Sequence, residues 1–118
     1  MNSMETLVVL GSSDMGAGFL ILLLGWFLKK NKVPRNRVVG IRTKQSLASD
    51  EAWYRINTYG GKKLILGGTL LVVLGATILG LRPNFPHSHL VLAFSPLVIL
   101  AYPVIAILRF SAKNAQRP

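Results

Sequence analysis

Three long stretches of this chain carry almost no charge, and this feature most constrains its fold. Residues 7–28 contain one charged side chain, Asp14, whereas residues 64–81 and 90–108 contain none. A helix of a soluble domain needs a polar face, and these stretches lack one. They are 22, 18 and 19 residues long, and about 20 apolar residues cross a bilayer core. The sequence therefore predicts an all-α integral membrane protein with three transmembrane helices over these ranges.

The length and composition set the outer limits. A chain of 118 residues accommodates one domain, so we treat residues 1–118 as a single membrane domain. The absence of cysteine excludes disulfides and thiolate nucleophiles. A cleaved signal peptide is the alternative for the first stretch. A signal peptide has basic residues before its apolar segment, and here none precedes it.

The basic residues are concentrated between the first two stretches. Ten of the 14 Lys and Arg residues lie in residues 29–63, whereas the residues before the first stretch contain none. The positive-inside rule places this loop and the C-terminus in the cytoplasm and the N-terminus outside. Topology and attraction to anionic lipid account for the net charge of +10. We therefore expect anionic lipid as a partner of the loop, and no direct nucleic-acid binding.

The second half of this loop carries the signals of a helix start. Ser49 is a good N-cap residue, and the two acidic residues after it suit the positive end of a helix. A helix over residues 50–60 would place Trp53 on an apolar stripe, so we expect an amphipathic cytoplasmic helix at the membrane interface. The Gly60–Gly61 pair would then bend the chain before the second span.

Arg42 has two interpretations. In the structural one it pairs with Asp50 or Glu51, or caps a helix end. In the other it is a cytosol-facing recognition group for a phosphate, a lipid or a partner carboxylate. Trp53 also has two interpretations, a membrane anchor or a platform for a ligand, and the membrane anchor is favoured.

A pattern of specific residues extends through residues 36–63 of the loop. Its members are Asn36, Gly40, Arg42, Thr43, Ser46, Trp53, Asn57 and Gly60. This pattern resembles the signature of the SdpI-type immunity-protein family, bacterial membrane proteins related to the immunity protein for a secreted sporulation-delay toxin. Members often carry Pro-aromatic-Thr-Leu after the Arg-Thr pair, and Lys-Gln-Ser-Leu stands here instead. The chain thus resembles a short, three-span member of another branch.

The resemblance implies an immunity protein of the bacterial cytoplasmic membrane that protects the producing cell against a membrane-active toxin by non-catalytic binding. One alternative is a signalling scaffold that recruits a cytoplasmic regulator through residues 29–63, as family members are thought to do with a repressor. A second alternative is a small oligomeric transporter or channel. None of these functions needs a cofactor.

Glycines recur every seven residues in the first span, and again from the start of the second. The two rows are Gly11, Gly18 and Gly25, and Gly61, Gly68 and Gly75. Small residues let helices in lipid approach closely, and a seven-residue repeat keeps one side facing a partner. We expect the rows to meet, either as antiparallel neighbours or between protomers of a homo-oligomer. The glycine rows themselves, or the outer mouth, would be the binding surface for a toxin.

Asp14 falls on the first glycine row. An ionisable group within a span is a candidate functional residue. Its candidate partners are Ser95, at similar depth in the third span, and Arg82, His87 or His89 at the outer mouth. The alternative is that Asp14 is hydrated near the outer surface or caps the helix there.

Catalysis finds little support in the sequence. His87 and His89 lie close together but lack a cysteine or a second acidic ligand nearby, so we predict no metal site. No serine has an evident base and orienting acid, so we predict that the protein is not an enzyme.

Overall fold

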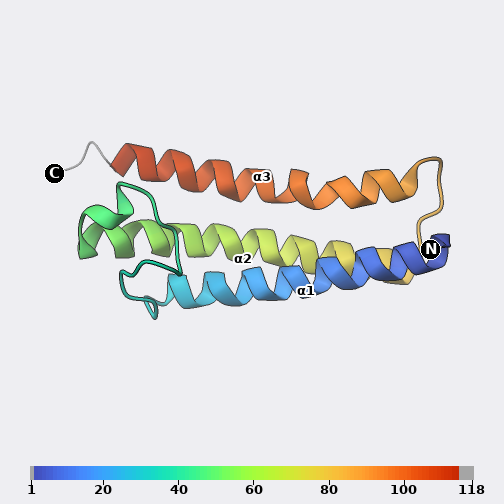
Figure 1. Ribbon diagram of the computed structural model, residues 1–118, viewed down its shortest axis with the longest axis horizontal. Helices are drawn as coiled ribbons and strands as arrows, with labels where there is room; N and C mark the ends of the chain where they lie inside the picture. The colour runs from blue at the N-terminus through green and yellow to red at the C-terminus, as the bar shows by residue number, and fades with distance from the viewer. Residues whose placement is uncertain (1, 115–118) are drawn as a thin grey trace.

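Three long helices make up most of the molecule (Figure 1). The computed structural model describes residues 2–114. It contains α1 (Ser3–Lys29), α2 (Asp50–Leu81) and α3 (Ser88–Asn114), with a short 3-10 helix, η1 (Ser46–Ala48), before α2. Each long helix is long and apolar enough to cross a membrane, and no strand occurs within residues 2–114. The predicted all-α fold with three spans is confirmed.

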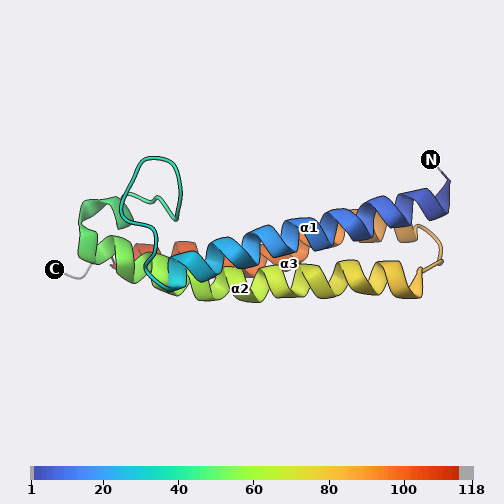
Figure 2. The ribbon, with the colours of Figure 1, turned by 90° about the horizontal axis from the view of Figure 1, so that it is seen from below.

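Helices α1 and α2 form an antiparallel pair that lies side by side in both views (Figure 2). The two glycine rows face each other between these helices. The contacting pairs are Gly11 with Gly75, Gly18 with Gly68, and Gly25 with Gly61. A Cβ atom added to Gly18 would lie 2.6 Å from the carbonyl oxygen of Gly68. Because no side chain fits at that separation, glycine lets the two backbones touch.

Helix α3 packs on α2 and has little contact with α1. It continues through Pro96 and Pro103, each of which removes a backbone N–H donor. The hydroxyl of Ser95 donates to the carbonyl oxygen of Leu92 at 2.7 Å. This is the carbonyl that Pro96, four residues later, deprives of its helical partner, so Ser95 offsets the loss locally.

The prediction of a separate amphipathic helix over residues 50–60 is wrong. These residues are the first turns of α2, which continues without a break to Leu81. The helix start is confirmed, because the side chain of Ser49 accepts the N–H of Ala52 at 3.0 Å. The segment therefore runs directly into the second span instead of lying along the membrane surface.

Gly60 and Gly61 do not bend the chain, because their lack of side chains is used in packing. Gly60 lies beneath the side chain of Ile41, and Gly61 lies against the backbone of α1, where its added Cβ would be 2.5 Å from the carbonyl oxygen of Gly25. Glycine lowers helix propensity by about 1 kcal/mol relative to alanine. The contacts on both sides of α2 outweigh that cost.

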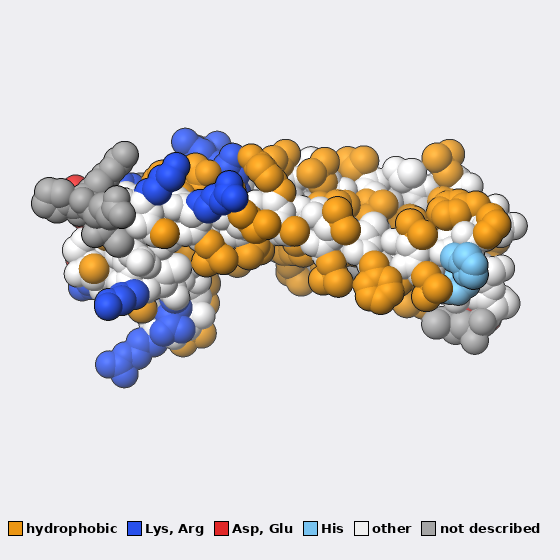
Figure 3. All heavy atoms as spheres, turned by 90° about the horizontal axis from the view of Figure 1, so that it is seen from above, with side chains coloured by type: hydrophobic (Ala, Val, Ile, Leu, Met, Phe, Trp, Pro, Cys, Tyr) orange, Lys and Arg blue, Asp and Glu red, His pale blue; other side chains and the backbone are white. Residues whose placement is uncertain are grey.

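The chemical character of the surface changes along the long axis of the molecule (Figure 3). Lys and Arg side chains gather toward one end, which we call the basic end, and the histidines lie at the other. Large apolar side chains cover the helices between them. Those more than half exposed include Phe19, Leu20, Leu23, Val73, Phe94, Leu97 and Val98. So much exposed apolar surface suits helices whose outer faces contact lipid.

Candidate functional site in the basic loop

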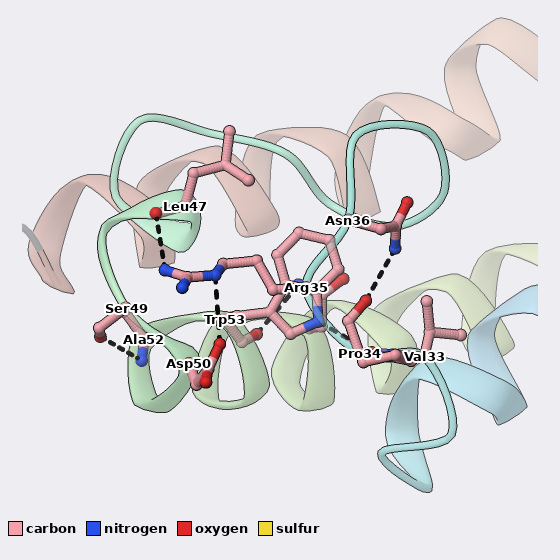
Figure 4. Close-up of polar contacts among 10 residues, drawn as sticks. Val33, Pro34, Arg35, Asn36, Leu47, Ser49, Asp50, Ala52 and Trp53 are labelled. Carbon is pink, nitrogen blue, oxygen red and sulfur yellow. Dashed lines mark hydrogen bonds and ion pairs between the residues drawn. The ribbon is translucent and has the colours of Figure 1, made fainter.

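The loop between α1 and α2 folds onto the first turns of α2, and Trp53 lies at the centre of this contact (Figure 4). The indole is fully buried, and its N–H donates to the carbonyl oxygen of Val33 at 2.9 Å. Gly40 packs against the indole ring and has a φ of 118°, and a Cβ added to it would lie 2.8 Å from the ring. Trp53 is therefore packed inside the protein, so its predicted role as a membrane anchor is wrong.

Asn57, one turn further along α2, holds the loop by its backbone. Its side-chain oxygen accepts the N–H of Ile41 at 2.7 Å, and its amide nitrogen donates to the Trp53 carbonyl oxygen at 2.9 Å. The same nitrogen lies 3.3 Å from the carbonyl oxygen of Ile41. The side chain is 1% exposed. A buried amide that pairs with both sides of one residue's backbone fixes the loop in a single register on the helix.

Thr43 and Ser46 close the next part of the loop by pairing with each other. The N–H of Thr43 donates to the Ser46 hydroxyl at 2.8 Å, and the N–H of Ser46 donates to the Thr43 hydroxyl at 3.1 Å. The Thr43 hydroxyl also lies 2.5 Å from that of Ser111 on α3. The loop is thus joined to both α2 and α3.

Asn36 shapes the first half of the loop. Its side-chain oxygen accepts the N–H groups of Val38 and Val39, both at 2.7 Å, and its nitrogen donates to the Pro34 carbonyl oxygen at 2.8 Å. Figure 4 shows the amide turned toward the Pro34 carbonyl. Asn36 therefore satisfies the backbone of a turn that has no helical or strand partner.

Arg35 is a site residue that the sequence analysis misses. Its Nε lies 3.1 Å from a carboxylate oxygen of Asp50, and its Nη1 donates to the Leu47 carbonyl oxygen at 3.2 Å (Figure 4). The sequence could have pointed to this pair, because Asp50 is an acid at the start of α2 that can take a basic partner. Spacing alone does not select one partner among several nearby arginines.

Arg42 is exposed, and within residues 2–114 it makes no hydrogen bond or ion pair. Asp50 pairs with Arg35, and Glu51 lies 3.7 Å from Arg55. The prediction that Arg42 pairs with either acid is therefore wrong. Its neighbours in the chain are both fixed, Ile41 by Asn57 and Thr43 by Ser46, so the arginine projects from an ordered backbone.

Two polar residues near the end of α3 also belong to the site, and the sequence analysis does not single them out. Ser111 is 2% exposed, and Asn114 is 6% exposed and accepts a hydrogen bond from Nε of Arg55. Both share one helix face with the buried Ile107. The sequence could have indicated them, because Ser111 and Asn114 follow Ile107 at helical spacing and so continue its buried face.

Asp14 lies apart from the loop site, in the first half of α1. The residue is 7% exposed, and its Oδ2 has no hydrogen-bond partner in the described part of the chain. The expected partner Ser95 bonds to Leu92 instead. A capping role is wrong, because α1 begins eleven residues earlier, at Ser3, and is capped there by Asn2.

Residues 2–114 contain no candidate metal site, because no three His, Asp or Glu side chains come together there. His87 takes part in the turn between α2 and α3, with a φ of 60°. The absence of a metal, a cofactor and catalysis stays a prediction.

A model of the SdpI/YfhL protein family matches residues 32–107, which is more than half of the chain. The chain belongs to the SdpI/YfhL family. The matched region includes most of the loop site, all of α2 and most of α3, and it leaves out α1. Asp14 and the first glycine row therefore lie outside the matched residues. No curated protein and no solved structure matches the chain.

Proposed function

We propose that this SdpI/YfhL protein is a membrane immunity protein that protects the producing cell against a membrane-active toxin by binding it, without chemistry. The observation that carries the proposal is the family match across the loop site, α2 and α3, on a chain with three helices able to cross a membrane. The membrane in question is the bacterial cytoplasmic membrane, with the basic end in the cytoplasm.

We place the toxin on surfaces that the helices leave open. The glycine rows contact each other within one chain, so they offer no open surface. The exposed apolar faces of α1 and α3 remain, together with the end opposite the basic end. In this proposal the toxin docks there within the bilayer and can no longer assemble with its own copies. The loop site holds the three helices in the arrangement that forms this surface.

The test is survival of a toxin-sensitive bacterium that expresses the chain. Cells with the wild-type chain should survive a dose of a secreted membrane-active toxin that kills cells with an empty vector. The matched negative control is Gly18→Leu, which disrupts the α1–α2 contact. Equal killing of wild-type and empty-vector cells, with the chain present in the membrane, would overturn the proposal.

Arg42 favours a second candidate function, a scaffold that recruits a cytoplasmic regulator. It is exposed, has no partner within residues 2–114, and stands on a fixed backbone. Such a guanidinium suits bidentate binding of a partner carboxylate or phosphate. Val38, four residues earlier in the same loop, is 83% exposed and offers apolar contact to a partner.

A comparison of two arginine variants in the full-length chain separates the two candidates. Arg37 is also exposed and unpaired within residues 2–114, so Arg37→Ala is the matched control for Arg42→Ala. A scaffold predicts that Arg42→Ala abolishes retention of a soluble regulator and Arg37→Ala does not. Toxin protection that persists in Arg42→Ala would assign immunity to the membrane surface instead.

Asp14 favours the third candidate, a transporter or channel, because a buried carboxyl with an unpaired oxygen is a common feature of ion and proton pathways. The test is solute or ion flux in liposomes. Flux that Asp14→Asn abolishes would support this function, and absence of flux in wild-type liposomes would remove it.

A further inference from the structure

A groove of about 270 Å³ opens between α2 and α3 at the basic end. It is lined by Tyr59 of α2 and by Tyr102, Ile105, Arg109, Phe110 and Lys113 of α3. The loop site does not use this groove. Its walls combine aromatic rings with cations, a combination that suits neither lipid tails alone nor open water.

The aromatic walls are ordered. The rings of Tyr59 and Phe110 stack with centroids 3.9 Å apart and planes 7° from parallel. The ammonium of Lys63 lies 5.4 Å from the ring centre of Tyr59 and 5.3 Å from that of Tyr102. It also donates a hydrogen bond of 3.2 Å to the Tyr102 hydroxyl. These contacts hold a lysine at the side of the groove, on neutral partners.

The positive charge of the groove is not neutralised by the described part of the protein. Lys63, Arg109 and Lys113 make no ion pair within residues 2–114. The two acids at this end, Asp50 and Glu51, are engaged by other arginines. Arg109 and Lys113 line the groove, and Lys63 lies beside it on the rings of Tyr59 and Tyr102. These cations attract an anion, and Arg109 and Lys113 can hydrogen-bond a phosphate without losing another partner.

The sequence on both sides of the groove leads us to expect it at the depth of lipid headgroups. Lys63 directly precedes the charge-free residues 64–81, and Arg109 directly follows residues 90–108. Toward the apolar region, Leu66 continues the face of Lys63 and Val98 continues the face of Tyr102, at helical spacing. Leu66 is 43% exposed and Val98 is 75% exposed, so an acyl chain can extend along both.

We propose that this groove binds the phosphate headgroup of one anionic phospholipid of the phosphatidylglycerol class. Arg109 and Lys113 contact the phosphate, the charge of Lys63 beside the groove attracts it, and the stacked Tyr59 and Phe110 rings form the wall. A bound lipid would bridge α2 and α3, which share fewer contacts than α1 and α2. The inference does not depend on the proposed immunity function.

The test is native mass spectrometry of the full-length chain in detergent, titrated with dioleoyl phosphatidylglycerol or with dioleoyl phosphatidylcholine. Wild type should bind the anionic lipid at least tenfold more tightly than the zwitterionic one. Arg109→Gln and Lys113→Gln should each weaken phosphatidylglycerol binding about fivefold, the effect of removing one cation near an anionic headgroup. Arg37→Gln removes the same charge from the exposed loop, outside the groove, and should weaken phosphatidylglycerol binding far less than either groove substitution.

Three results would overturn the proposal. The first is equal affinity of wild type for both lipids. The second is an equal loss in Arg37→Gln, which would indicate general charge attraction instead of a site. The third is displacement of the lipid by millimolar glycerol phosphate, which would identify a soluble phosphate as the ligand. Both groove substitutions are at exposed positions, and circular dichroism of each variant checks that the helices are retained.

Discussion

At the scale of single residues, two side chains of α2 determine the conformation of the loop. Trp53 fills the space beneath Gly40 and donates to Val33, and Asn57 pairs with the backbone of Ile41. Because Asn57 is 1% exposed, no water replaces its hydrogen bonds if the amide is lost. Burial of an unpaired backbone N–H is costly, so the order of the loop depends on this one amide.

Asn57→Leu should destabilise the protein by about 2 kcal/mol, the cost of leaving a buried peptide group without a partner. The measurement is denaturant unfolding in detergent micelles, followed by circular dichroism. Asn84→Leu is the control, because Asn84 is exposed in the turn between α2 and α3. A loss in Asn57→Leu no larger than that in Asn84→Leu would show that the loop does not depend on Asn57.

The arginines of the loop show the limit of prediction at this scale. The sequence identifies Asp50 as an acid at a helix start, and the structure pairs it with Arg35, whereas Arg42 has no partner within residues 2–114. Partner choice depends on how the loop folds back over α2. That path is determined by Gly40 and Ile41 packing against α2, contacts that no local pattern encodes.

At the scale of helices, backbone contact between α1 and α2 is the main feature. The seven-residue glycine spacing was sufficient to predict which faces meet, because the period fixes one side of each helix. The sequence left open whether the rows meet within one chain, and in the structure they do. The same reasoning failed for Gly60–Gly61, because a glycine pair that serves packing and one that bends a chain look alike in sequence.

Gly18→Leu should destabilise the α1–α2 pair by roughly 3 kcal/mol, because an added side chain collides with the backbone at Gly68. Gly16→Leu, two residues earlier, is the control, since a Cβ at Gly16 would meet nothing within 4 Å. That control should be neutral or slightly stabilising, because leucine favours helix more than glycine does. Thermal unfolding of both variants in detergent measures the difference. Equal melting temperatures would contradict the packing described here.

At the scale of the whole molecule, the charge distribution predicts the orientation in the membrane. Ten basic residues lie in residues 29–63, at one end of three apolar helices. Composition and span length were sufficient to predict the number of helices, because the bilayer limits which sequences can cross it. They did not predict that α2 extends into the loop, since its first turns are stabilised by the loop that folds onto them.

Because the chain has no cysteine, single-cysteine variants report orientation without background. A membrane-impermeant maleimide should label Asn84→Cys in intact cells and Lys44→Cys only after permeabilisation. Both positions are exposed, so accessibility within the protein is matched. Labelling of Lys44→Cys in intact cells would show that the loop lies outside the cell, opposite to the predicted orientation.

The most direct test of the central claim is survival of toxin-challenged cells that express the wild-type chain, Arg42→Ala or Asn57→Leu at equal membrane levels. We expect protection by wild type and by Arg42→Ala, and weakened protection by Asn57→Leu, because the loop site maintains the helix arrangement that binds the toxin. Wild-type cells that die at the same toxin dose as empty-vector cells would contradict it.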